Sequence, residues 1–269
     1  MIYETDKKEF FHNYAKTTGV VLTWLIDEID SFKGKAYVDS KNRYYISINY
    51  GYGEVITAFQ TYSLDLYNEI LNIFPDISSI DFIHNGYIGR ESIYNDVIKC
   101  LNYHYKFQGI LNFGITAEQP FIVKLITEND INIAKQYDDL YFNSLTPKDG
   151  RRMTNQIKHV ESLKSGDFKI YFAMINNIPI GYILAYHFKE YFAWVFPEIE
   201  IEENYRQKGY GAAFLTEVTK DNLKHGDDLY YSGVSADNIA SRKTAEKAGY
   251  TIATSRISIN VNKEGEQNT

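Results

Sequence analysis

The sequence predicts an α/β protein made of two domains, and three observations lead to this prediction. The chain has 269 residues, a length that allows one large domain or two of ordinary size. Runs with the spacing of strands alternate with runs that have the spacing of helices, which is the pattern of an α/β fold. The pattern restarts near residues 114–120. We therefore predict an N-terminal domain over residues 1–118 and a second domain over residues 119–269.

The elements expected in the N-terminal domain begin with a hairpin. Residues 35–39 and 44–48 are rich in β-branched and aromatic side chains and flank a polar turn. Apolar residues between 64 and 74 recur close to a helical period, and Pro75 ends that helix. The remaining elements expected here are a strand over residues 80–83 and a helix over residues 92–105.

The second domain has a more regular series of elements. The Asn176-Asn177 turn, whose residues tolerate positive φ, joins two predicted strands. Gly226 and Gly249 end two predicted helices. The expected strands cover residues 121–126, 169–175, 178–188, 197–202, 228–234 and 250–261. The expected helices cover residues 131–137 (capped by Asp130), 152–163, 212–224 and the segment that ends at Gly249.

Composition and charge exclude several functional classes. The 28 basic and 35 acidic residues give a net charge of -7, which argues against nucleic-acid binding through phosphate neutralisation. The single cysteine, Cys100, excludes an internal disulfide, and the six scattered histidines have no ligand spacing, so we expect no metal site. The longest apolar run, residues 20–26, is too short to span a bilayer, and the N-terminus lacks a signal-peptide pattern. We expect a cytoplasmic protein with no nucleic-acid or membrane partner.

One segment carries clear chemistry: Arg206-Gln-Lys-Gly209-Tyr-Gly211, between a predicted strand and a predicted helix. Glycines at a helix start present free backbone N–H groups, and the helix dipole adds positive charge, which suits a pyrophosphate. Lys208 precedes Gly209 and no hydroxyl follows, so this is not a Walker A loop. A dinucleotide fingerprint would need a third glycine. Gly51-Tyr-Gly53 repeats the tripeptide, but no Arg lies three residues before it and no helix follows, so we predict a turn there.

The loop combined with the segment that follows it resembles a known family. Arg-x-x-Gly-x-Gly opens a helix after an acidic strand; Asn238-Ile-Ala-Ser241 and Ala245-Glu-Lys-Ala-Gly-Tyr250 follow. In this order the motifs are similar to those of the GNAT superfamily of acyl-CoA-dependent N-acetyltransferases, over about residues 121–261. The resemblance implies a GNAT-type mixed sheet, flanked by helices, in which strands four and five splay apart.

The same resemblance implies acetyl-CoA as cosubstrate, with no metal. The residues expected to hold acetyl-CoA lie at the splayed strand, in the glycine loop and at the start of the last helix. They are Ile201, Glu202, Arg206, Gln207, Lys208, Gly209, Tyr210, Gly211, Ala212, Asn238 and Ser241. Asn238 could instead act only as a helix cap.

The reaction expected from the resemblance is attack of an amine on a thioester. A carboxylate near the acceptor would help to deprotonate the amine, and Glu198 and Glu200 share one face of the predicted strand by its period of two. Many family members have a proton-donating tyrosine where this chain has Ala245. The general acid is therefore unassigned: bulk water, Tyr230 or Tyr231 could donate the proton, and Tyr250 is expected in the core.

The leading prediction is an N-acetyltransferase of the EC 2.3.1 type that acts on a small-molecule amine, as a monomer or homodimer. The alternatives are a non-catalytic acyl-CoA-binding or sensing module and a protein N-acetyltransferase. The N-terminal domain resembles the degenerate partial GNAT domain of the two-domain branch that includes zwittermicin-type aminopolyol antibiotic acetyltransferases. It would cover the acceptor side, and its 10 basic and 15 acidic residues, against 18 and 20 in the rest of the chain, would suit a cationic acceptor.

Overall fold

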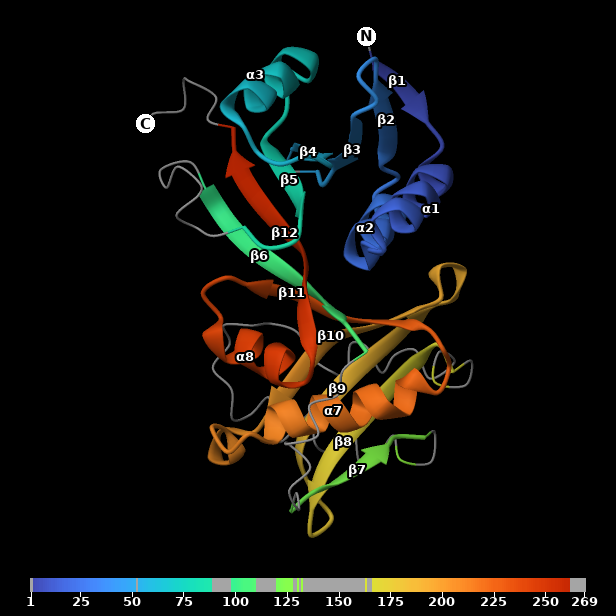
Figure 1. Ribbon diagram of the computed structural model, residues 1–269, viewed down its shortest axis with the longest axis vertical. Coiled ribbons are helices and arrows are strands. Elements are labelled where there is room, and N and C mark those ends of the chain that lie inside the picture. The colour runs from blue at the N-terminus through green and yellow to red at the C-terminus, as the bar shows by residue number, and fades with distance from the viewer. Residues whose placement is uncertain are drawn as a thin grey trace. The chain divides into compact units, whose positions relative to one another are not determined.

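A computed structural model describes residues 2–51, 53–88, 98–109, 120–127, 130, 132, 163 and 166–261. The chain divides into two compact units (Figure 1). Unit 1 comprises Met1–Lys106, Gly233–Ile239 and Ile252–Thr269, and unit 2 comprises Phe107–Ser232 and Ala240–Thr251. Unit 1 thus takes two segments from the C-terminal part of the chain, whereas both predicted domains are continuous. Residues 118 and 119 lie outside the described residues, so the predicted boundary stays a prediction.

The described residues of unit 1 form a sheet accompanied by the helices α1, α2 and α3. Its strands follow the order β1-β2-β3-β4-β5-β12-β6. The neighbours from β1 to β4 pair antiparallel, β4 and β5 pair parallel, and β5 and β12 pair antiparallel. The elements are β1 (Ile2–Thr5), α1 (Lys7–Thr18), α2 (Thr23–Ser31), β2 (Lys35–Asp39), β3 (Tyr44–Asn49), β4 (Glu54–Ala58), α3 (Leu64–Ile73), β5 (Ser79–Asn85), β6 (Ile98–Phe107) and β12 (Tyr250–Asn260).

Several predictions for this unit are confirmed, and one is wrong. The hairpin of β2 and β3, the helix α3 and the strand β5 form where the sequence predicts them. The helix predicted over residues 92–105 is wrong from residue 98 onward, because this segment is the strand β6. In β6, Leu101, Tyr103, Tyr105 and Phe107 are all buried, and this period of two is that of a strand.

Unit 2 contains the glycine loop and the elements that position it. Its strands follow the order β11-β10-β9-β8-β7; β10 and β11 pair parallel, and the other neighbours pair antiparallel. The elements are β7 (Ile122–Leu125), β8 (Phe168–Ile175), β9 (Ile178–Phe188), η4 (Lys189–Tyr191), β10 (Ala193–Ile201), η5 (Glu203–Tyr205), α7 (Tyr210–Leu223), β11 (Asp228–Ser235) and α8 (Ile239–Lys247). The helices predicted over residues 131–137 and 152–163 lie almost wholly outside the described residues.

Turn chemistry explains where these elements begin and end. Asn176 and Asn177 adopt φ values of 49° and 63° between β8 and β9, the left-handed conformation of a tight hairpin turn. Gly226 and Gly249 adopt φ values of 75° and 91° just after α7 and α8, as expected for glycines that end helices. These predictions from the sequence are confirmed.

The strands β10 and β11 separate part-way along their length. Their parallel pairing joins 193–196 to 228–231 and stops there. The next residue of β10, Pro197, has no N–H to donate to a neighbouring strand. The register between β9 and β10 shifts at the same place, between Val195 and Glu198, and such a bulge bends a strand. The remainder of β10, residues 197–201, continues beyond this pairing with β11.

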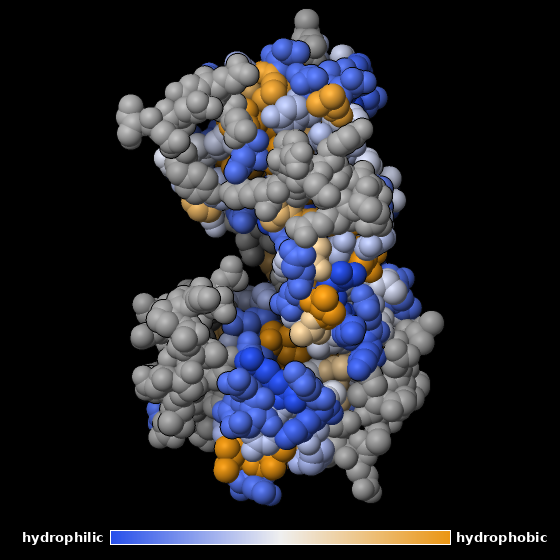
Figure 2. Space-filling view, turned by 90° about the vertical axis from the view of Figure 1, so that its left-hand side faces the viewer, coloured by the Kyte–Doolittle hydropathy of each residue, from blue (hydrophilic) through white to orange (hydrophobic). Residues whose placement is uncertain are grey.

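Buried aromatic and aliphatic side chains fill the interior of each unit. Examples are Tyr45, Ile56 and Phe82 in unit 1 and Phe172, Phe196 and Phe214 in unit 2. The described surface in Figure 2 is mostly hydrophilic, with hydrophobic side chains in separate small groups. Among the described residues, no helix is both long enough and apolar enough to cross a membrane.

Candidate acyl-CoA site

The glycine loop leads from the end of β10 into α7. After η5, Gln207 and Gly209 adopt φ values of 61° and 80°, so the chain turns sharply before the helix begins. Gly209 is the N-cap of α7 and supplies no side-chain acceptor. The first bond of the helix runs from the Ala213 N–H to the Gly209 carbonyl at 3.1 Å. The N–H groups of residues 210–212 come before Ala213 and have no carbonyl partner within the helix. They can therefore donate to an external acceptor.

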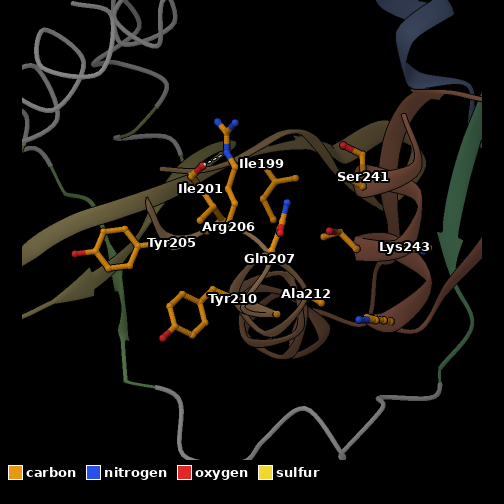
Figure 3. A pocket seen from close by; sticks show the side chains of 14 residues that line it. Ile199, Ile201, Tyr205, Arg206, Gln207, Tyr210, Ala212, Ser241 and Lys243 are labelled. Carbon is orange, nitrogen blue, oxygen red and sulfur yellow. Dashed lines mark hydrogen bonds between the residues drawn. The ribbon is translucent and has the colours of Figure 1, made fainter. Parts of the chain in front are cut away.

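A pocket of about 420 Å³ lies at this helix start, wholly within unit 2 (Figure 3). The end of β10, the glycine loop, the first turn of α7 and one stripe of α8 form its walls. The lining residues are Ile199, Ile201, Tyr205, Arg206, Gln207, Gly209, Tyr210, Gly211, Ala212, Ala240, Ser241, Lys243, Thr244 and Lys247. In Figure 3, Ser241 and Lys243 lie on one side of the pocket, and Tyr210 and Ala212 mark the start of α7.

The space over Gly211 in this pocket is large enough for a side-chain Cβ. A Cβ built on Gly211 would lie 3.6 Å from the Thr244 side chain and 3.8 Å from Ile201, which are ordinary van der Waals distances. Its φ is not in the left-handed range. Neither packing nor backbone conformation therefore requires glycine at this position.

Arg206 is held at the end of β10. Its Nε donates to the Ile201 carbonyl at 2.7 Å, and its Nη2 lies 2.6 Å from Oε1 of Glu200. The guanidinium points away from the start of α7 in Figure 3. Its backbone belongs to the predicted phosphate loop, but its charge is already paired with the Glu200 carboxylate.

Glu198 and Glu200 lie on the face of β10 opposite to the pocket. Glu198 pairs across the sheet with Leu184, and Glu200 with Tyr182, whereas Ile199 and Ile201 line the pocket. Residues opposite each other on neighbouring strands share a face. The Tyr182 hydroxyl donates to Oε1 of Glu198 at 2.5 Å. The two carboxylates therefore project from the other face of β10 than Ile199 and Ile201 do.

Three residues predicted to hold the cofactor are not among those lining the pocket. Lys208 folds back onto η5, where its Nζ donates to the Asn204 carbonyl at 2.8 Å and lies 5.4 Å from the Tyr205 ring centre. The Glu202 N–H donates to the Ile180 carbonyl at 2.9 Å, and burial raises the pKa of its carboxyl. Asn238 lies in the turn before α8, where its N–H donates to the Ser235 carbonyl at 2.9 Å.

The tyrosines near the end of α8 and in β11 are buried. Tyr250 is 1% exposed, and its hydroxyl lies 2.7 Å from Oγ1 of Thr219; burial raises the pKa of this phenol strongly. The prediction that Tyr250 packs in the core is confirmed. Tyr230 and Tyr231 are also buried, as is Ala245.

The structure brings most of the predicted cofactor residues together and adds six. Ile201, Ser241 and the loop residues Arg206, Gln207 and Gly209 to Ala212 line one pocket. The additional lining residues are Ile199, Tyr205, Ala240, Lys243, Thr244 and Lys247. Two signals could have identified most of them: Ile199 precedes Ile201 by one strand period, and residues 240, 244 and 247 recur at helical spacing. Among the described residues, no group of three His, Cys, Asp or Glu could hold a metal ion.

Comparison with known proteins finds the same fold elsewhere. Residues 133–250 match the model of the acetyltransferase (GNAT) family, and this segment includes every residue that lines the pocket. No curated protein matches the sequence. A GNAT family acetyltransferase from Colwellia psychrerythraea has a similar structure with a TM-score of 0.63 and 11% sequence identity, covering 97% of this chain and 100% of that chain.

A Drosophila protein is also similar, with a TM-score of 0.51 and 10% identity, covering 97% of this chain and 98% of that chain. Both matches therefore extend over nearly the whole sequence and include both units. At such identities the likeness concerns the fold alone. The predicted mixed α/β fold of the GNAT type is confirmed.

Proposed function

We propose that this protein is an N-acetyltransferase that uses acetyl-CoA to acetylate the amine of a small molecule. The observation that carries the proposal is the glycine loop, which opens the uncapped start of α7 into a pocket beside the end of β10 that continues beyond its pairing with β11. The GNAT match over the same residues supports it.

The residues present fit the phosphate end of acetyl-CoA. The N–H groups of residues 210–212 would donate hydrogen bonds to the oxygens of a pyrophosphate, and the dipole of α7 would stabilise its charge. The space over Gly211 would admit it without movement of Thr244. Arg206 would hold the loop against β10 through Ile201 and Glu200, because its guanidinium is already occupied there.

The residues near the splay fit the uncharged arm of the molecule. Residues 197–201 of β10 lie beyond its parallel pairing with β11, and their backbone groups would pair with the amides of the pantetheine as an added strand does. Ile199 and Ile201 provide an apolar wall. When bound, acetyl-CoA supplies a thioester whose carbonyl carbon accepts the amine.

Glu198 is the carboxylate that we propose as the general base. It would take a proton from the acceptor ammonium, directly or through a water, while the Tyr182 hydroxyl orients its carboxylate. Glu200 would act as a positioning residue because it holds Arg206. The acidic surplus of the first 118 residues favours a cationic acceptor.

The test measures release of the CoA thiol from acetyl-CoA across a panel of small amines, including aminopolyols and aminoglycosides, with peptide N-termini and lysine peptides as a second panel. We expect turnover on at least one small amine. Glu198→Gln should lower kcat by about 100-fold with an unchanged dissociation constant for acetyl-CoA, whereas Glu203→Gln, on the exposed η5, should change neither.

Two results would contradict this proposal. Tight binding of acetyl-CoA with no turnover on any amine would favour a sensing module. Turnover on peptides alone would favour a protein N-acetyltransferase.

A further inference from the structure

The two lysines of α8 that line the pocket are not part of the predicted phosphate loop. Lys243 and Lys247 are four residues apart in α8, so they lie on the same side of the helix, one turn apart. Thr244, next to Lys243, faces Gly211 in the first turn of α7. The stripe of α8 that carries the lysines therefore lies across the pocket from the glycine loop.

The charges of the pocket are unevenly distributed. Its uncharged lining includes Ile199, Ile201 and, on the first turn of α8, Ala240 and Ser241. Both lysines lie further along α8, and the guanidinium of Arg206 is paired with Glu200. Lys243 is exposed and has no hydrogen bond or ion pair with any described residue. Lys243 and Lys247 of α8 thus add positive charge to this pocket, separately from the N–H groups at the start of α7.

We propose, on the basis of the proposed function, that Lys243 and Lys247 bind the 3′-phosphate of CoA and so select CoA over its 3′-dephospho form. The N–H groups at the start of α7 bind the pyrophosphate. A CoA molecule carries a further phosphate monoester with up to two negative charges, and two ammonium groups on an adjacent wall would match that charge. Lysine binds phosphate as a point charge and needs no bidentate geometry, which suits side chains that are exposed.

The experiment is calorimetric titration with CoA and with 3′-dephospho-CoA, which differ only in this phosphate. The proteins are the wild type, Lys243→Gln, Lys247→Gln, the double variant and Lys224→Gln. Lys224 is a matched control because it is an exposed lysine at the far end of α7, paired with Asp221. Melting temperatures show whether each variant is folded.

We expect the wild type and Lys224→Gln to bind CoA about 10- to 100-fold more tightly than 3′-dephospho-CoA, since a hydrogen bond to a charged group contributes about tenfold or more in affinity. The double variant should bind both ligands within about threefold of each other, with its affinity for 3′-dephospho-CoA unchanged, and the single variants should lie between. Raising the salt concentration should reduce the wild-type preference.

Three results would overturn the inference. Equal wild-type affinity for both ligands would show that nothing in the protein recognises the 3′-phosphate. A double variant that keeps the preference would assign that recognition to other residues. A double variant that loses affinity for both ligands equally would assign the lysines to the pyrophosphate. Wild-type protein that binds neither ligand would instead contradict the proposed function itself.

Discussion

The chain contains the tripeptide Gly-Tyr-Gly twice, and the two copies have different structures. At Gly51 to Gly53, the Tyr50 N–H donates to the Gly53 carbonyl at 3.2 Å and closes the hairpin between β3 and β4. At Gly209 to Gly211, the same residues begin α7. The following residues explain the difference: Val55, Ile56 and Thr57 favour a strand, whereas Ala212, Ala213 and Leu215 favour a helix.

Glycine occupies the second glycine position of each copy, Gly53 and Gly211, for a different physical reason. A Cβ on Gly53 would lie 2.5 Å from Oγ and 2.6 Å from Cβ of Ser78, and Gly53 has a φ of 157°. The packing of unit 1 therefore requires glycine there. A Cβ on Gly211 would meet only ordinary contacts at 3.6 Å or more. A glycine that the protein does not need for its own packing or backbone conformation points to an external ligand.

The largest effect should come from a negative charge at the start of α7. In Gly209→Asp the new residue tolerates the φ of 80°, but it places a carboxylate where phosphate should bind. Like charges in contact cost several kcal/mol, so the affinity for acetyl-CoA should fall by about 100-fold or more. The matched control is Gly209→Asn, which has the same size without the charge and should lose about tenfold or less. Equal affinities of the two variants, measured by calorimetry, would contradict the phosphate assignment.

The next effect should be on stability and should come from the first tripeptide. Gly53→Ala places a methyl group on Ser78, and overpacking of this kind costs about 1–3 kcal/mol. Chemical denaturation should show this loss in the free energy of unfolding, while calorimetry should show acetyl-CoA affinity within about twofold of wild type. An unchanged stability would mean that the contact with Ser78 relaxes easily.

Gly211→Ala should leave the stability unchanged or higher and lower the affinity for acetyl-CoA, the opposite of Gly53→Ala. Alanine is the better helix former and has room beside Thr244, so the melting temperature should stay the same or rise. The added methyl group would occupy the pocket, and we expect acetyl-CoA affinity to fall by about tenfold, or about 1.4 kcal/mol. Unchanged affinity together with unchanged stability would remove the contrast between the two tripeptides.

The smallest effect concerns pH and lies in unit 1. His104 donates to or accepts from Oγ1 of Thr254 at 3.1 Å, and a Cβ on Gly233 would lie 3.0 Å from its Nε2. Although the residue retains some exposed surface, desolvation, with a smaller effect of the Arg256 charge, lowers its pKa to about 3. Below pH 6.5 the unfolded state therefore binds a proton that the folded state does not, and stability falls as pH falls.

This loss should amount to about 1 kcal/mol between pH 6.5 and 5.5. Denaturation curves of the wild type and of His104→Gln at both pH values isolate it, because the other groups titrate in both proteins. The wild type should lose about 1 kcal/mol more than the variant over this interval. Identical losses would show that His104 is protonated in the folded protein.

Local signals predicted much of the fold and of the candidate site. Two asparagines were enough to predict the turn between β8 and β9, and the loop from Arg206 to Gly211 predicted where a helix would start beside a pocket. The strand β6 differs from the helix predicted there because Leu101, Tyr103, Tyr105 and Phe107 are buried at the strand period of two. The start of helix α1 is predictable from Asp6, a typical N-cap residue, which accepts from the N–H groups of Lys8 and Glu9.

Tertiary arrangement accounts for what the sequence did not predict. Nothing in the residues near Arg206 indicates that its guanidinium pairs with Glu200, because that contact depends on how η5 turns the chain back onto β10. Lys243 and Lys247 line the pocket only because α8 packs against Gly211. A spacing rule orders residues along one element, but it does not determine which element lies opposite.

The most direct test of the central claim is a crystal structure of the protein with acetyl-CoA. We predict that pyrophosphate oxygens lie within hydrogen-bond distance, about 2.7–3.2 Å, of the N–H groups of Tyr210, Gly211 and Ala212, with the pantetheine along residues 197–201. A cofactor bound elsewhere, with the start of α7 facing only solvent, would contradict the account.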